Sequence, residues 1–444
     1  MTDENGIVYT LERCVGRGGQ GAVWLTRGGR HVVKLLSRGQ DREALRRQIA
    51  AVKRMNVRDL HVARPLALLR PPEVGYVAEF LEEMEPIGKL LAPPKGTTSV
   101  ATWYQETGGL RRRLRLLAHA GEALGGLHSR GLIYGDVSHD NVFVSAPVDA
   151  FEARLIDLDN LRYESDARSA VYTPGYGAPE LVSGKAGPTS LSDAWAFATL
   201  AFHVLALVHP FCGDLVTDGE PELEEEAFAG KLPWIDHPTD ARNRSSRGIP
   251  RATVLGERLA ALGRMTFEEG ALDRLKRPGV GAWVERLHRA ADQTLKCEGC
   301  SSTFLVSARA CPFCGAARGA FHTVRLQRWE PGRGLVKEMD AVEKLLLAGE
   351  TLALTRRHTR GESGVGARAE ELVLEQWEFG VHVLPRSTPL WVTAPGVVEP
   401  SAARAVFSKG TTLRIVADPY QSYVLHFGPL DAPHRVALIC GGTR

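Results

Sequence analysis

The sequence predicts an α+β fold in which two lobes are followed by a small metal-binding module and a β-rich C-terminal domain. Three observations support it: a glycine-rich turn between short apolar strands, long helical stretches in mid-chain, and two cysteine pairs followed by short strands. The 444 residues have room for about two to four domains. We place the domains at 1–85 (N-terminal lobe), 86–293 (C-terminal lobe), 294–319 (metal-binding module) and 320–444 (β-rich domain of unknown role).

The composition is typical of a soluble globular protein, with 44% hydrophobic residues, 24% charged residues and a formal net charge of +3. This balance makes nucleic acid an unlikely partner, and we interpret the run Arg111–Arg113 as a solvated helix start. The most apolar stretch, Ala194–Val208, is too short to cross a bilayer and predicts a buried helix. The N-terminus is polar and acidic, unlike a signal peptide, so we expect a cytoplasmic protein without membrane contact.

The first motif is the run Val15–Val23, which fits the pattern G-x-G-x-x-G-x-V and would let the backbone approach phosphates closely. Its pattern positions, expected to bind the nucleotide, are Gly16, Gly18, Gly21 and Val23. A dinucleotide-binding loop would open a helix, but here the strands 22–26 and 31–36 follow, joined by a hairpin turn. Lys34 lies in the second of these apolar strands, where it is expected to hold the α- and β-phosphates.

The segment Val74–Leu81 predicts a strand that leads into the connection between the lobes. We expect Glu79 and Leu81 to offer backbone groups to the edge of the adenine. Ala78 falls where a larger residue is common. A plain buried strand is the alternative interpretation.

The second motif is the run Tyr134–Asn141, between the strand-like residues 132–133 and 142–144. Asp136 is followed five positions later by Asn141. We expect Asp136 to accept the proton of a substrate hydroxyl and Asn141 to bind a magnesium ion. The spacing alone is weak evidence, but the other required groups occur in the right order around it.

The third motif is Leu155–Asn160, in which Asp157 is expected to chelate magnesium. An acidic turn at the end of a strand is the alternative. The distance from Asn141 and the flanking strand favour the metal.

Two carboxylates farther along are expected to have structural roles. Glu180 ends the element Ala178–Glu180 and needs a buried partner, for which Arg277 is the candidate. Asp193 is expected to cap the apolar helix and to hold the backbone of the Tyr134–Asn141 loop.

Taken together, residues from about 7 to 293 resemble a eukaryotic-type (Hanks-type) Ser/Thr protein kinase domain. The resemblance implies a two-lobed protein-kinase fold, ATP with magnesium, and phosphate transfer to Ser/Thr hydroxyls in signalling. It assigns catalytic roles to Lys34, Asp136, Asn141 and Asp157. The runs Gly135–Ser138 and Asp157–Asp159 look similar to a divergent bacterial branch in which a zinc ribbon often follows the kinase. Members of this branch are often paired with von Willebrand type A proteins and metal-dependent protein phosphatases.

Several residues depart from the kinase pattern. Gln48 lies where the helix after the third strand should present a Glu to the lysine, so either Glu43 forms that pair from an adjusted register or the pair is absent. Gly135 replaces an Arg that binds loop phosphate, Ser138 replaces a Lys that neutralises the transferred phosphate, and Asp159 replaces the Gly after the magnesium Asp. These departures keep open a pseudokinase scaffold with weak or no phosphotransfer, although the metal and base ligands are spared.

The loop before Ala178 contains Ser165, Ser169, Tyr172 and Thr173 as candidate autophosphorylation sites. Because no Arg occupies position 135, we expect activity without loop phosphorylation. Alanine at both serines and at Thr173 together is therefore expected to leave substrate phosphorylation largely intact.

Four of the seven cysteines form two C-x-x-C pairs separated by ten residues: Cys297, Cys300, Cys311 and Cys314. Each pair can give two thiolates to one tetrahedral zinc ion, and the neighbouring glycines and proline favour metal over two unrelated reducible pairs. We expect a closed structural zinc site, which indicates a reducing compartment.

Beyond residue 320, short apolar strands alternate with glycine- and proline-rich turns and predict a small β-sandwich or barrel. One helix is expected near Glu338–Leu347, and Arg356–His358 is interpreted as a solvated turn. No catalytic constellation is evident. We favour a docking or regulatory role, and salt-dependent nucleic-acid binding by this region is a weaker hypothesis.

Overall fold

The computed structural model describes residues 1–19, 21–37, 41–166, 172–336, 341–347, 349–363, 365–377, 380–385, 390–393, 405–407, 411–413 and 423–440. They belong to two compact units. The first unit consists of Met1–Thr107, Arg115–Arg251 and Glu257–Glu285, and the second of Gly108–Leu114, Ala252–Gly256 and Arg286–Arg444. In the part of the chain that is described, no helix combines the length and the apolarity needed to cross a membrane.

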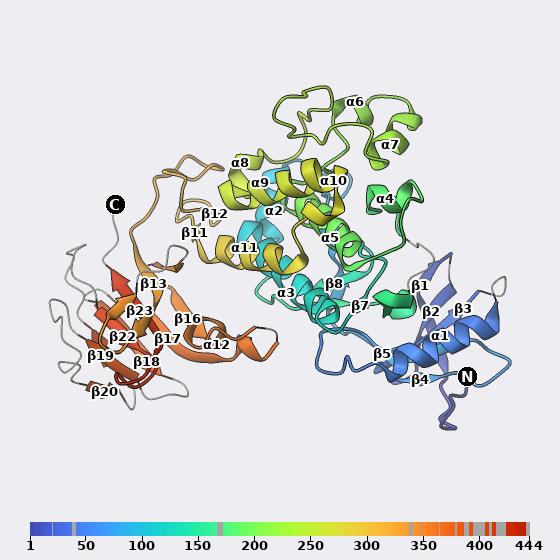
Figure 1. Ribbon diagram of the computed structural model, residues 1–444, viewed down its shortest axis with the longest axis horizontal. Coiled ribbons are helices and arrows are strands. Elements are labelled where there is room, and N and C mark those ends of the chain that lie inside the picture. Colours follow the sequence, from blue (N-terminus) through green and yellow to red (C-terminus); the bar gives the residue numbers. More distant parts are fainter. Residues whose placement is uncertain are drawn as a thin grey trace. The chain divides into compact units, whose positions relative to one another are not determined.

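The first unit begins with an antiparallel five-stranded sheet in the order β1-β2-β3-β5-β4, with helix α1 beside it (Figure 1). Ile49 of α1 packs against Leu68, Tyr76 and Ala78 of the sheet. Asp41 caps α1 by accepting hydrogen bonds from two backbone amides of its first turn. The bounds are β1 Leu11–Gly18, β2 Gly21–Thr26, β3 His31–Leu36, α1 Arg42–Arg54, β4 Ala67–Leu68 and β5 Gly75–Glu79.

The middle of the chain is mostly helical, with short strands that carry the loops of the site. Helix α5 is buried along most of its length, as its apolar sequence predicts. The helices are α2 Val100–Glu106, α3 Gly109–His128, α4 Pro179–Val182, α5 Ser190–Ala206, α6 Asp214–Thr217, α7 Pro221–Phe228, α8 Arg251–Val254, α9 Gly256–Arg264, α10 Gly270–Leu272 and α11 Val280–Asp292. The strands are β6 Met84–Pro86, β7 Leu132–Ile133, β8 Val142–Ser145, β9 Ala153–Leu155 and β10 Arg162–Tyr163.

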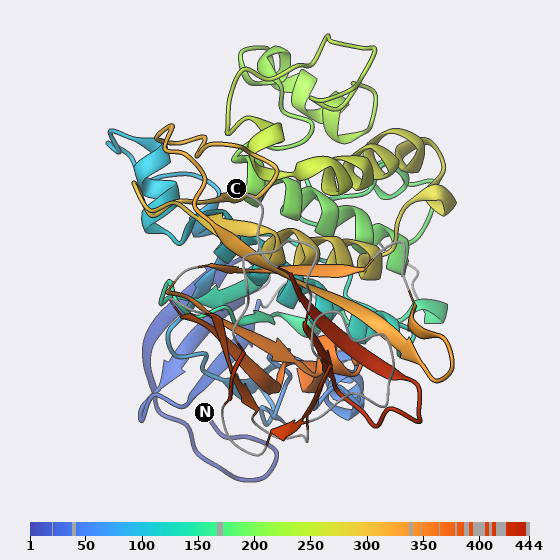
Figure 2. The same cartoon turned by 90° about the vertical axis from the view of Figure 1, so that its left-hand side faces the viewer.

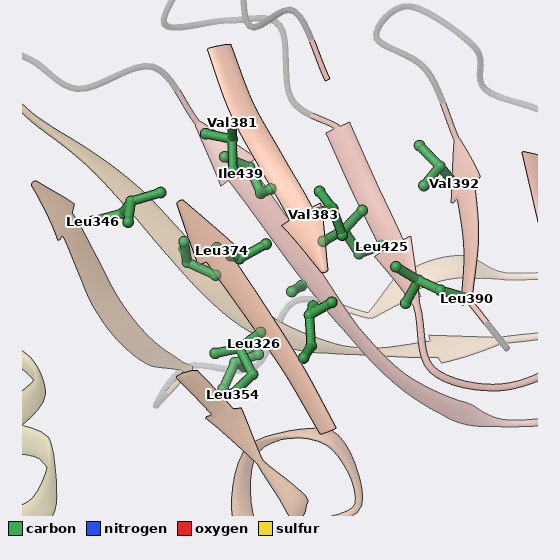
Figure 3. Close-up of a cluster of buried hydrophobic side chains, with 13 residues drawn as sticks. Leu326, Leu346, Leu354, Leu374, Val381, Val383, Leu390, Val392, Leu425 and Ile439 are labelled. Atoms are coloured by element: carbon green, nitrogen blue, oxygen red, sulfur yellow. The ribbon is translucent and has the colours of Figure 1, made fainter. Parts of the chain in front are cut away.

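The second unit contains a short hairpin followed by a β-sandwich. One sheet has the order β14-β13-β23-β22-β19-β20, with β15 also paired to β13, and the other has the order β16-β17-β18-β21. Buried leucine, valine and isoleucine side chains from both sheets form one core, shown in Figure 3. The strands, orange to red in Figure 2, run from β13 to β23.

The bounds in this unit are β11 Thr294–Lys296, β12 Thr303–Leu305, β13 Phe321–Glu330, β14 Gly334–Val336, β15 Val342–Leu347, β16 Thr351–Thr355, α12 Arg356–Thr359, β17 Glu370–Trp377, β18 Gly380–Pro385, β19 Leu390–Thr393, β20 Ala405–Phe407, β21 Thr411–Leu413, β22 Tyr423–His426 and β23 His434–Cys440. The β-rich fold predicted for this region is confirmed, and its form is a sandwich rather than a barrel.

Three local predictions were wrong. The helix expected at Glu338–Leu347 is a strand over Val342–Leu347, because pairing with β13 outweighs its helical propensity; residues 337–340 lie outside the described residues. The Arg111–Arg113 run is not a solvated helix start, since Arg112 and Arg113 are buried. The Arg356–His358 segment is not a solvated turn but part of helix α12. Its His358 is buried, with Nε2 3.3 Å from Nζ of Lys344.

Candidate active site and metal centre

Lys34 of β3 lies between two carboxylates of the segment that follows β9. Its Nζ is 2.5 Å from Oδ1 of Asp157 and 2.7 Å from Oδ2 of Asp159. Burial lowers the pKa of Lys34, but the charges of Asp159 and Asp157 outweigh this effect, so the pKa lies above its ordinary value. The sheet therefore presents a stable cation to this segment.

The Tyr134–Asn141 loop is held in place by Asp193 of α5. The backbone amides of Tyr134 and Gly135 donate to its carboxylate at 2.7 and 2.9 Å, which confirms that Asp193 holds the loop. Asp193 does not cap α5, however. Thr189 is the N-cap residue, and its hydroxyl accepts from the amide of Ser192.

Asp136 and Asn141 face each other within this loop. The Nδ2 of Asn141 donates to Oδ2 and to the backbone oxygen of Asp136, each at 3.0 Å. The backbone oxygen of Asn141 accepts from the backbone amide of Ile156, at 3.0 Å. Asp157 directly follows Ile156. This backbone hydrogen bond therefore places Asp157 next to the loop that carries Asp136 and Asn141.

Asp157 has a left-handed backbone conformation, with φ of 54°. A non-glycine residue in this region carries strain that the surrounding structure must hold, and such residues concentrate at functional sites. The following Leu158 is fully buried and anchors the turn.

Thr173 binds Asp136, a contact that the sequence analysis missed. Both its backbone amide and its hydroxyl donate to Oδ1 of Asp136, at 2.9 and 2.8 Å. Burial raises the pKa of Asp136, while the bonds from Thr173 and Asn141 act in the opposite direction. Because Thr173 holds the Asp136 carboxylate in this structure, we no longer expect alanine at Ser165, Ser169 and Thr173 together to leave substrate phosphorylation intact. Ser169 lies outside the described residues.

The glycine-rich run forms the turn between β1 and β2. Gly21 has φ of 154°, and a Cβ there would lie 2.0 Å from the backbone oxygen of Leu35, so only glycine fits beside β3. Val23 pairs directly with Lys34 across β2 and β3. At the end of β5, the side chain of Glu79 pairs with Arg154 at 3.0 Å. The predicted contacts of Gly16, Gly18 and Leu81 with a nucleotide remain predictions.

Helix α1 does not use Glu43 as the partner of Lys34. Oε1 of Glu43 accepts from Arg47 on the exposed face of α1, at 2.9 Å. Nε2 of Gln48 donates to the backbone oxygen of Leu161, at 2.8 Å. Among the described residues, the carboxylates in ion-pair contact with Lys34 are those of Asp157 and Asp159. The sequence left open whether Glu43 pairs with Lys34 or the ion pair with α1 is absent. In the described residues the ion pair with α1 is absent.

Glu180 and Arg277 form the predicted buried ion pair. Two parallel bonds of 2.9 and 3.0 Å join the guanidinium to the carboxylate, and the Arg277 side chain is fully buried. The prediction is confirmed. This ion pair joins α4, which follows the segment containing Thr173, to the residues that precede α11.

The four cysteines of the C-x-x-C pairs converge in the second unit. Their Sγ atoms all lie within 4.8 Å of one another. Cys297 and Cys314 are 3.5 Å apart, and Cys300 and Cys311 are 3.7 Å apart, measured between Sγ atoms. Thiolates about 2.3 Å from a tetrahedral zinc ion lie about 3.8 Å from each other, whereas a disulfide needs about 2.0 Å. The donor set therefore fits zinc.

The zinc-binding module shares its core with the sandwich. Cys297, Cys311 and Phe304 form one buried cluster with Phe321 of β13 and with leucines of β15. A module of this size cannot bury a hydrophobic core of its own. The structure shows that its apolar side chains are completed by the strands that follow.

The side-chain oxygens of Asn141 and Asp157 fit magnesium, which prefers carboxylate and carbonyl oxygens. Lys34 supplies the cation that phosphates require, and Gly21 allows a close turn beside it. The residues present are therefore compatible with a magnesium-bound nucleoside triphosphate.

Comparisons with known proteins agree with this chemistry. The family model described as a protein kinase domain matches residues 9–247, more than half of the chain. Serine/threonine-protein kinase pkn2 of Myxococcus xanthus is 30% identical over 301 residues, 62% of this chain and 35% of that protein. CBL-interacting protein kinase 4 of Oryza sativa subsp. japonica is 28% identical over 278 residues, 57% of this chain and 56% of that protein. Serine/threonine-protein kinase PknG of Mycolicibacterium smegmatis is 28% identical over 209 residues, 45% of this chain and 25% of that protein. The chain thus covers from a quarter to just over half of the length of these relatives.

Proposed function

This chain belongs to the protein kinase family, and from that premise we propose that it transfers the γ-phosphate of ATP to Ser/Thr hydroxyls of a protein substrate. The observation that carries the proposal is the convergence of Lys34, Asp136, Asn141 and Asp157 from three separate segments. The serine/threonine-specific names of two of the relatives support the choice of acceptor.

Each group has a distinct role in this proposal. Lys34 binds the α- and β-phosphates, and Asn141 and Asp157 hold the magnesium that neutralises charge on the phosphates. Asp136 accepts the proton of the acceptor hydroxyl, and Thr173 keeps the Asp136 carboxylate directed into the site.

The departure at position 135 is consistent with activity that needs no loop phosphorylation. Gly135 has φ of 86°, a conformation that an arginine would adopt only with strain. The loop backbone is held instead by Asp193. We therefore propose that the loop is set by this carboxylate rather than by a phosphate–arginine contact.

We propose a docking or regulatory role for the C-terminal unit. We propose that one structural zinc holds its hairpin and that the sandwich binds a partner. Through the resemblance to the divergent bacterial branch, the first partners to test are a von Willebrand type A protein and a metal-dependent protein phosphatase. The predicted boundaries after residues 85, 293 and 319 remain part of this proposal, as do bacterial signalling and a cytoplasmic location.

The proposed activity is tested with radiolabelled ATP, magnesium, the full chain and a general protein acceptor, followed by phosphoamino-acid analysis. Asp136→Ala is expected to abolish incorporation into serine and threonine. Asp140→Ala is the matched control, because Asp140 lies in the same loop with its side chain 71% exposed, and it should retain activity. Incorporation by the wild type that is no greater than by Asp136→Ala would refute the enzyme and favour a pseudokinase scaffold.

A further inference from the structure

Asp159 occupies a place in the site that the usual roles do not explain. Its Oδ2 lies 2.7 Å from Nζ of Lys34, and both side chains are 9% exposed. Asp157 also contacts Lys34, but its side chain is 27% exposed and it is the residue proposed to bind magnesium. Of the two carboxylates, Asp159 is therefore the more deeply buried partner; it also accepts a hydrogen bond from the Tyr76 hydroxyl and has no proposed role in binding metal.

A buried ammonium group needs a fixed counter-charge, because an uncompensated charge in the interior is costly. In α1, the one acidic residue is Glu43, whose side chain is 81% exposed and paired with Arg47. Position 48, where the kinase pattern has the glutamate, is a glutamine bonded to the backbone of Leu161. The buried counter-charge of Lys34 therefore lies on the segment 157–159 and not on α1.

We propose that Asp159 is the positioning residue for Lys34 and that it replaces the helix glutamate of the kinase pattern. The inference rests on the proposed phosphotransfer function and deepens it. With Asp157 assigned to the metal, Asp159 remains as the ion-pair partner that directs Lys34 toward the phosphates. The position of Lys34 then depends on the turn 157–161 and not on an ion pair with α1.

The local structure supports this role. Asp159 lies on the short 3-10 helix Leu158–Asn160, whose first residue is fully buried. The bond from Gln48 to Leu161 closes the other end of the turn. A carboxylate held at both sides in this way can orient Lys34 with little loss of side-chain freedom on binding.

The test measures kcat/KM for ATP in labelled phosphate transfer by the full chain. Asp159→Asn keeps the shape and removes the charge, and it is expected to lower kcat/KM by about a hundredfold. Glu43→Ala is the matched control and should equal the wild type. Gln48→Glu added to Asp159→Asn returns a carboxylate from α1 and is expected to recover at least about tenfold, which a merely structural defect would not do.

The outcomes separate this inference from the proposed function. An active wild type with an equally active Asp159→Asn variant overturns the inference alone. The same holds for a double variant that is no more active than Asp159→Asn while unfolding at the wild-type midpoint. A wild type without transfer overturns the proposed function, and this inference with it.

Discussion

Removing the guanidinium of Arg277 is expected to be the most destabilising single change to a charged residue in the catalytic lobe. Besides its two bonds to Glu180, Arg277 donates to the backbone oxygens of Leu191 at 2.8 Å and Gly270 at 2.8 and 3.2 Å. Its Cζ also lies 4.9 Å from the centre of the Trp195 ring. Arg277→Met would leave a carboxylate and two carbonyl groups in the interior without these donors.

The magnitude follows from these contacts. Breaking a buried ion pair by removing one partner costs about 3–5 kcal/mol, and we expect Arg277→Met to fall in this range. Glu180→Gln should cost less, about 1–2 kcal/mol, because the amide still accepts a bond and the guanidinium keeps its backbone acceptors. The order of the two variants is therefore as informative as either value.

The assay is urea unfolding of the full chain, followed by tryptophan fluorescence and fitted for the transition of the first unit. Arg242→Met is the control, since the ion pair of Arg242 with Asp240 is solvent-exposed and its loss should not shift the transition. The reasoning is refuted if Arg277→Met unfolds with the Arg242→Met variant, or if Glu180→Gln is the more destabilising of the pair.

Three further predictions follow from the structure. Thr173→Ala should lower phosphate transfer at least about tenfold by freeing Asp136, while Ser165→Ala should not; equal rates would contradict this. Burial lowers the pKa of His209 to about 4 from 6.5, so the unfolded chain takes up this proton first. The wild type should therefore lose about 2–3 kcal/mol of stability between pH 6.5 and 4 that His209→Gln retains, with no such difference above pH 6.5, as measured by urea unfolding at each pH. Elemental analysis should find one zinc per chain, and Cys311→Ser should remove it and lower the unfolding midpoint of the second unit only.

Much of the C-terminal lobe could be predicted from sequence because each of its motifs places the required side chains within one short segment. The Asp136–Asn141 spacing lies in one loop, and the partner of Glu180 could be named because a buried carboxylate requires a cation. The two C-x-x-C pairs likewise indicate a four-thiolate tetrahedral site from their spacing alone. In each case the chemistry limits the number of possible arrangements.

The errors share a different cause, since they depend on contacts between distant segments. The residues near Val342 have a helical pattern, but strand pairing with β13 decides their structure. The second contact of Lys34, with Asp159, joins residues 125 positions apart, and no local pattern indicates it. The contact of Thr173 with Asp136 joins residues 37 positions apart, and its bonds follow only from the folded loop.

The central claim is that Lys34, Asp136, Asn141 and Asp157 serve one magnesium-bound triphosphate. Calorimetric titration of the full chain with ATP, with and without magnesium, tests it most directly. The account predicts binding that strengthens with magnesium in the wild type, and a loss of this magnesium dependence in Asp157→Asn. Binding that ignores magnesium in the wild type, or that Asp157→Asn leaves unchanged, would contradict it.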